Sequence, residues 1–128
     1  GHMIEVVCGI VSKDGKVLIC KRKKNKSLGG FWEFPGGKIE DKESTINALN
    51  RELMEELGLK VTFHSYFLSV THKYPDFSIQ LTALKCRFVE ASFIMTDHDE
   101  YKWVEALDLL NYQLAAADIP IAEALVKV

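Results

Sequence analysis

The segment from Ser44 to Gly58 constrains the fold more than any other part of this chain. Branched aliphatic residues recur within it at spacings of three and four, which predicts an amphipathic helix with one apolar face. These residues are Ile46, Leu49, Leu53 and Leu57. Ser44 is a candidate N-cap, and Gly58 stands where a C′ glycine ends a helix. Such a helix needs an apolar surface to pack against.

Strand patterns on both sides of this segment predict that surface. Apolar and aromatic runs bounded by turn residues are typical of strands. The expected strands cover residues 4–12, 17–20, 31–34, 61–70 and 77–88, with a short one around Trp103. The apolar pattern of 77–88 slips by one residue at Leu84, which predicts a bulge or a change of buried face. Pro35-Gly36-Gly37 is expected to end the ladder after Phe34.

A second helix is expected from Asp118, as N-cap, through Leu125. The order of elements predicts an α/β fold with one sheet packed between helices. The length of 128 residues fits a single domain over 1–128. Gly1 and His2 are interpreted as a tag remnant before Met3, and no secretory signal follows, so we expect a cytoplasmic protein.

Composition excludes several classes of protein. With 27% charged residues, 48% hydrophobic residues and a net charge of −2, the chain is not disordered, collagen-like or a strongly basic nucleic-acid scaffold. No apolar stretch approaches the ~20 residues that span a membrane. The cysteines, Cys8, Cys20 and Cys86, are widely separated within apolar runs. We therefore expect reduced thiols in the core.

Three glutamates share one face of the expected helix, away from the leucine stripe. Glu52, Glu55 and Glu56 stand at i, i+3 and i+4. Carboxylates at these spacings repel one another and weaken a helix, and Arg51 is the only nearby cation. Such a cluster suits a hard divalent ion, Mg²⁺ or Mn²⁺, which prefers oxygen ligands. The alternative is a solvated acidic face.

The spacing around the glutamates resembles the Nudix box. The matching positions are Gly37, Glu43 and the run Arg51-Glu52-Leu53-Met54-Glu55-Glu56-Leu57-Gly58-Leu59, and the lead-in Glu33-Phe34-Pro35-Gly36-Gly37-Lys38 resembles the MutT branch. The resemblance implies a Nudix fold, an α/β/α sandwich with a mixed sheet, and hydrolysis of nucleoside diphosphates linked to another group.

The same resemblance implies roles for individual residues. The implied metal ligands are Glu52, Glu55, Glu56 and the backbone carbonyl of Gly36. Arg51 matches the residue that fixes the glutamates by ion pairing, and Glu43 matches a supporting position.

Hydrolysis of a phosphoanhydride also requires a general base. Glu55 and Glu56 are direct candidates. MutT-like relatives imply a loop acid before the last strand, for which Asp97 is our choice over Asp99 and Glu100, with a plain polar loop as the alternative. The neighbouring His98 is expected at the surface.

Candidate substrate contacts come from three places in the chain. Arg22 matches an arginine near the nucleotide in MutT-like proteins, whereas the lysines that follow it are expected to be a solvated loop. Lys38 is a candidate phosphate ligand beside the metal site. Phe34 and Trp32 offer aromatic area for base stacking, although either also fits the core.

Residues 112–120 resemble the matching segment of bacterial CTP pyrophosphohydrolases, a MutT-like subgroup. There Asp118 replaces the Asn of 8-oxo-dGTP-specific relatives. An ionised carboxylate only accepts hydrogen bonds, and the amino group of cytosine donates one. Asp118 is therefore a candidate base contact as well as an N-cap.

The leading hypothesis is a Mg²⁺-dependent nucleoside triphosphate pyrophosphohydrolase that prefers cytidine nucleotides and releases pyrophosphate. The alternatives are an 8-oxo-dGTP diphosphatase that avoids mutations and a hydrolase of another nucleoside diphosphate derivative. A non-catalytic nucleotide sensor is disfavoured because the box is intact. The expected partner is a small nucleotide rather than a nucleic-acid polymer or a membrane, and the expected state is a monomer or homodimer.

Overall fold

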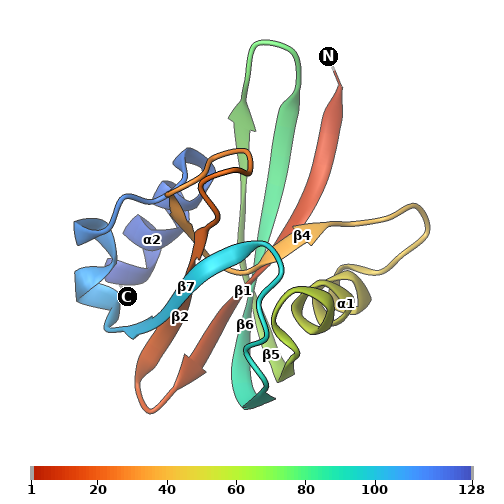
Figure 1. The fold of residues 1–128 in the computed structure, drawn as a ribbon. Helices are drawn as coiled ribbons and strands as arrows, with labels where there is room; N and C mark the ends of the chain where they lie inside the picture. Colours follow the sequence, from red (N-terminus) through yellow and green to blue (C-terminus); the bar gives the residue numbers. More distant parts are fainter. Residues whose placement is uncertain (1, 128) are drawn as a thin grey trace.

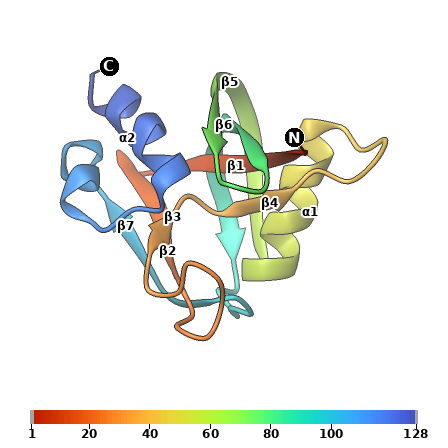
Figure 2. The same ribbon diagram turned by 90° about the horizontal axis from the view of Figure 1, so that it is seen from above.

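The computed structural model describes residues 2–127 and contains a seven-stranded mixed sheet with helices on both faces (Figures 1 and 2). Gly1, the first residue of the expected tag remnant, lies outside the described range. The strands are β1 (Met3–Lys13), β2 (Lys16–Arg22), β3 (Trp32–Glu33), β4 (Gly36–Lys38), β5 (Leu59–Lys73), β6 (Ser78–Ala91) and β7 (His98–Val104).

The strand order is β3-β2-β1-β6-β5, with β4 paired to β1 and β7 paired to β2. The β1–β6 pair is parallel and the other pairs are antiparallel. The predicted α/β fold with a mixed sheet between helices is confirmed. Among residues 2–127, no helix combines the length and apolar character needed to cross a membrane.

The predicted central helix is confirmed as α1 (Thr45–Leu57). The hydroxyl of Ser44 accepts a hydrogen bond from the Asn47 amide at 3.1 Å. Gly58 has φ 57°, and its N–H donates to the Met54 carbonyl at 3.0 Å, which ends the helix. The leucines of the stripe are buried, whereas Ile46 is 39% exposed.

The opposite face of the sheet is covered by the C-terminal part of the chain (Figure 2). Two 3₁₀ helices, η1 (Ala106–Asn111) and η2 (Ala116–Asp118), precede α2 (Ile119–Val126). Trp32 is buried in this layer, and its ring meets the ring of Tyr112 edge to face with centroids 5.5 Å apart. Of the two readings given for Trp32, the core role is therefore the one that the packing supports.

Two apolar cores lie on either side of the sheet because alternate residues of β1 and β6 point to opposite faces. In β6, Leu81 and Ala83 pack on the α2 side, whereas Leu84 and Cys86 pack on the α1 side. The slip in the sequence pattern is thus a change of buried face. The register shifts of the β5–β6 pair begin at Lys60, Phe63 and Tyr66 of the partner strand.

The prediction that the strand ends before Pro35 is confirmed, since β3 ends at Glu33, but a further strand follows that the sequence did not indicate. Gly36 and Gly37 form β4, opposite Cys8 and Val7 of β1. Position 36 requires glycine because a Cβ there would collide with the Val7 carbonyl and the Cys8 backbone. The missing side chains of these glycines allow the close approach between β4 and β1.

The three cysteines are free and buried, as predicted. Burial raises the pKa of the Cys8 and Cys20 thiols well above the ordinary value and raises that of Cys86 to about 11. Raised pKa values leave little thiolate at neutral pH, so these residues behave as apolar core groups.

Candidate active site

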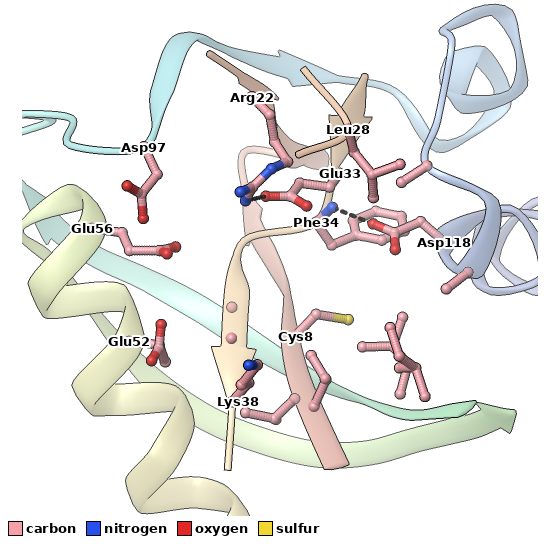
Figure 3. A pocket seen from close by; sticks show the side chains of 18 of the residues that line it. Cys8, Arg22, Leu28, Glu33, Phe34, Lys38, Glu52, Glu56, Asp97 and Asp118 are labelled. Atoms are coloured by element: carbon pink, nitrogen blue, oxygen red, sulfur yellow. Dashed lines mark hydrogen bonds and ion pairs between the residues drawn. The ribbon is translucent and has the colours of Figure 1, made fainter. Parts of the chain in front are cut away.

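A cavity of about 360 Å³ opens between α1, β4 and the η2 segment (Figure 3). Its lining joins segments that are far apart in the sequence. The charged members of the lining are Arg22, Glu33, Lys38, Glu52, Glu56, Asp97 and Asp118. Figure 3 shows the acids of α1 together with Asp97 at one end and Asp118 beside Phe34 at the other.

At the first end, Glu56 is the most constrained acid. Its Oε1 atom is buried and has no hydrogen-bond partner among residues 2–127. Burial raises the pKa of Glu56 to about 9, and a hydrogen bond with Asp97 adds to this effect. The same hydrogen bond lowers the pKa of Asp97, and the positive charge of Lys26, whose Nζ lies 3.5 Å from Asp97 Oδ1, lowers it further. Glu56 therefore holds the proton of this pair, and Asp97 is ionised.

Arg51 organises the remaining acids of α1. Its guanidinium donates to both carboxylate oxygens of Glu43, at 2.8 and 2.9 Å, and to Glu52 Oε1 at 2.8 Å. It also donates to the Lys38 carbonyl at 3.0 Å, which ties α1 to β4. These hydrogen bonds lower the pKa of Glu43 to about 2. Glu43 is thus an ionised support for Arg51.

The three predicted metal-binding glutamates are only partly brought together. Glu52 and Glu56 point into the cavity, whereas Glu55 is 60% exposed, lies outside the lining and rests 3.4 Å from Arg51. Within residues 2–127, no three acidic, histidine or cysteine side chains converge on one point. Mutual repulsion and the pull of Arg51 account for this spread.

The residues present nevertheless fit a hard divalent cation. An orphaned carboxylate oxygen inside a cavity needs a positive partner, and Glu56 Oε1 is such an atom. The neighbouring donors are all oxygens, the type that Mg²⁺ and Mn²⁺ prefer. The backbone at Gly37 lies directly against the Glu52 carboxylate. A Cβ at this position would collide with that carboxylate, so the approach requires glycine.

At the other end, Asp118 is 6% exposed, and its Oδ2 accepts a hydrogen bond from the Phe34 amide at 2.8 Å. Burial raises the pKa of Asp118 to about 8, and the nearby Glu33 charge adds to the rise. The predicted capping role is wrong: no side-chain cap hydrogen bond forms at α2. The carboxyl group is turned toward Phe34 instead.

Glu33 and His98 form a contact that sequence reasoning missed. Glu33 Oε2 accepts hydrogen bonds from Arg22 Nη1 at 3.2 Å and from His98 Nε2 at 2.8 Å. The prediction of a surface His98 is wrong, since the residue is 2% exposed. It begins β7 and pairs with Arg22 of β2. For Glu33, the available indication of a functional role was its place as a single acid between two buried aromatic residues. The residues around His98 gave no indication that it is buried.

The NUDIX domain family matches residues 6–124, which run from within β1 to within α2. The chain belongs to the Nudix family. The Nudix enzymes are hydrolases that use a divalent metal ion, and the oxygen-lined end of the cavity agrees with this requirement.

Individual relatives of this Nudix hydrolase have named activities. The chain is 39% identical over 122 residues to the CTP pyrophosphohydrolase of Escherichia coli (strain K12), covering 95% of this chain and 90% of that protein. It is 42% identical over 80 residues to the 8-oxo-dGTP diphosphatase of Proteus vulgaris, covering 62% of this chain and 71% of that protein.

Solved structures agree on the Nudix fold. The solution structure of the E. coli ORF135 protein matches with a TM-score of 0.82 at 38% identity, covering 98% of this chain and 90% of that one. The crystal structure of the MutT protein from Methanosarcina mazei Go1 matches with a TM-score of 0.88 at 24% identity, covering 98% and 94%. The latter likeness concerns the fold alone.

The other predicted site residues of this Nudix domain lie as follows. Lys38 and Phe34 line the cavity, whereas Asp99 and Glu100 are exposed in β7 outside the lining. Tyr74, at the turn between β5 and β6, also lines the cavity, and no feature of its sequence context indicated this position. These placements keep Asp97 as the loop acid nearest to the glutamates of α1.

Proposed function

We propose that this Nudix hydrolase is a Mg²⁺-dependent nucleoside triphosphate pyrophosphohydrolase that prefers cytidine nucleotides and releases a nucleoside monophosphate and pyrophosphate. The observation that carries the proposal is a single cavity with acidic oxygen donors at one end and a buried polar group over an apolar floor at the other. The identity to a CTP pyrophosphohydrolase supports the nucleotide class.

In this proposal Glu52 and Glu56 hold the metal, together with Glu55 and the Gly36 carbonyl. When bound, Mg²⁺ neutralises phosphate charge and makes a coordinated water more acidic. Arg51 keeps Glu52 in place through its 2.8 Å contact. Binding a cation also favours the ionised form of Glu56, which offsets the cost of burying that carboxylate.

Asp97 is the proposed general base. Its ion pair with Lys26, whose Nζ lies 3.5 Å from Oδ1, favours the ionised carboxylate and does not depend on a proton of Glu56. It faces the cavity beside Glu56 and is placed to take a proton from the attacking water (Figure 3). Lys38, at the exposed edge of the same cavity, is placed to contact the phosphates.

Base recognition is proposed for Phe34 and Asp118. Phe34 lines the cavity but is only 2% exposed, so it forms part of an apolar floor together with Cys8 and Leu81. Asp118 was expected to act as an ionised acceptor, but its raised pKa keeps a proton on the carboxyl group near neutral pH. A protonated carboxyl both donates and accepts hydrogen bonds. That pair of functions fits the adjacent ring nitrogen and amino group of cytosine.

An 8-oxo-dGTP diphosphatase is the second candidate, favoured by the 42% identity to an enzyme of that name. A pyrophosphate-release screen with Mg²⁺ separates the candidates. The substrates are CTP, dCTP, 5-methyl-dCTP, 8-oxo-dGTP, dGTP and ADP-ribose. We expect the highest kcat/KM for a cytidine nucleotide. Turnover of none of them contradicts the hydrolase proposal, and a clear lead of 8-oxo-dGTP favours the second candidate. Asp118→Asn keeps a donor and an acceptor and should leave the ranking unchanged, whereas an unchanged ranking in Asp118→Leu, which removes both, contradicts the base contact.

A further inference from the structure

A second hollow, of about 300 Å³, lies on the α2 side of the sheet, further along β1 and β6 than the candidate active site. The lining of the hollow and the lining of the candidate active site share no residue. Its volume is at the lower end of the range for small-molecule sites. Its apolar lining includes Ile10, Val17 and Leu125, and its polar lining includes His64, Lys85 and Arg87.

The hollow carries positive charge that is not neutralised by an acid of the described chain. Lys85 and Arg87 are two residues apart on β6, so their side chains point to the same face of the sheet. Among residues 2–127, no aspartate or glutamate lines the hollow, and the ion pairs use other cations. Lys127, the C-cap of α2, adds a cation at the helix end that borders the hollow. Such a concentration of charge attracts an anion.

His64 enters the lining of the hollow at an irregularity of β5. Phe63 of β5 lies opposite Cys86 of β6, and the next paired residue of β5, Ser65, lies opposite Lys85. His64 is therefore an extra residue without a partner in the pair, and bulges of this kind redirect side chains beside functional sites. His64 Nδ1 lies 2.9 Å from the Ser65 hydroxyl. A hydroxyl that donates to Nδ1 leaves the proton on Nε2, where it can be donated to a ligand.

The Lys85 ammonium is positioned without being neutralised. Its Nζ lies 4.8 Å from the centroid of the Phe67 ring. An aromatic face attracts a cation only weakly at an exposed site, so the charge and the N–H donors stay available to a ligand. Beside this group, Ile10 and Val17 are 4% and 8% exposed and form an apolar floor. The hollow thus combines cationic groups with an apolar floor.

We propose that this hollow is a second ligand site, which binds a small organic phosphate. Lys85, Arg87 and His64 hold the phosphate oxygens. The apolar body of the ligand lies over Ile10 and Val17. A phosphate monoester carries nearly two negative charges at neutral pH and three acceptor oxygens, so it can use several N–H donors at once. A carboxylate offers one charge and two oxygens, which suits this cluster less well.

Four probes test the proposal on the wild-type protein, in the presence of a chelator and without Mg²⁺. Phenyl phosphate carries both the phosphate and an apolar ring, inorganic phosphate lacks the ring, phenol lacks the charge, and benzoate replaces the phosphate with a carboxylate. Two-dimensional ¹H–¹⁵N NMR follows each titration. We expect phenyl phosphate to shift the amides of His64, Lys85 and Arg87 and to bind about tenfold more tightly than each other probe.

Lys85→Gln and Arg87→Gln test the charges. Each variant removes one cation and keeps a long polar side chain, so we expect each to weaken the binding of phenyl phosphate by about fivefold or more. Lys60→Gln removes an equal charge outside the hollow, from a residue of β5 whose Nζ lies 3.8 Å from Glu90, and is the matched control. Thermal melting checks that all three variants are folded. The comparison of probes on the wild type needs no variant.

The possible results separate a built site from weak attraction to the surface. Weaker binding in Lys85→Gln and Arg87→Gln, with unchanged binding in Lys60→Gln, supports the site. An equal loss in Lys60→Gln, shifts confined to β4 and α1, or a dissociation constant for phenyl phosphate above about 10 mM overturns it. Equal binding of inorganic phosphate contradicts the apolar floor, and tighter binding of benzoate contradicts the phosphate class. The titrations need neither metal nor turnover, so their outcome is independent of the proposed function.

Discussion

The two ends of the cavity are built in different ways. The proposed metal-binding end takes Arg51, Glu52 and Glu56 from one helix. The base end depends on contacts between distant segments: Phe34 and Asp118 are 84 residues apart, and Glu33 and His98 are 65 apart. Apart from Asp97, the first arrangement is encoded within one helix, whereas the second arises only in the complete fold. Rate and base preference should therefore respond to different substitutions.

The largest expected effect is at Glu56. Glu56→Gln removes the buried charge that a cation requires, and we expect kcat to fall by about 10³-fold. Because the base end is left intact, the ranking of nucleotides should stay the same. Steady-state kinetics on the substrate panel measures both quantities, with exposed Glu123→Gln as the matched control. A changed ranking of nucleotides would contradict the view that the two ends of the cavity control rate and base preference separately.

Gly37→Ala is expected to have the next largest effect. The new methyl group collides with the movable Glu52 carboxylate rather than with backbone, so the fold should survive while Glu52 is displaced. A shift of about 1 Å in a catalytic group costs about 10²-fold in rate. Isothermal titration with Mn²⁺ should show weaker metal binding. Full activity in this variant is the result that contradicts the assignment of Glu52.

Asp118→Asn tests the base end through pH. The folded protein keeps the Asp118 proton up to a pKa of about 8, whereas the unfolded chain loses it near the ordinary value of 3.8. Asp118 therefore lowers the stability of the wild type as pH rises from about 4 to 8, by up to ~1.4 kcal/mol per pH unit.

Asp118→Asn removes this pH dependence of the free energy of unfolding. Relative to the wild type, the variant should therefore become more stable as pH rises through the same window. Urea denaturation at several pH values measures the free energy of unfolding, with exposed Asp108→Asn as the control. A difference that does not vary with pH contradicts the raised pKa.

The smallest expected effect is at the start of α1. Ser44→Ala removes the hydroxyl that accepts from the Asn47 amide, which costs about 1 kcal/mol of stability. The active-site acids lie two turns away, so kcat and base preference should change little. Chemical denaturation and the same kinetic panel test this. A large loss of activity would mean that the metal-binding end depends on the helix terminus.

Local features of the molecule were predictable from the sequence. The caps and leucine stripe of α1 depend on neighbouring residues, and both were confirmed in position. The irregular apolar pattern of β6 could also be recognised in the sequence, because side chains alternate strictly between the two faces of a strand. These signals need no knowledge of distant partners.

Features set by tertiary contacts were not predictable. His98 follows an aspartate within an acidic run, and nothing nearby indicates burial; only its pairing with Arg22 places it under Glu33. Asp118 has the sequence context of a cap, but the unpaired amide of Phe34 competes for its carboxyl group. The pairing of β4 likewise depends on a close approach to β1. Each error involved a partner far along the chain.

The register shifts of β5 have a consequence for the behaviour of the protein in concentrated solution. This strand of 15 residues is at the end of the sheet order, with β6 as its neighbour. A regular strand of that length at an edge is a template on which other chains extend the sheet and aggregate. The shifts along the β5–β6 pair break the repeat of that edge into short pieces. From this geometry we expect the irregular edge to disfavour edge-to-edge polymerisation of the folded protein.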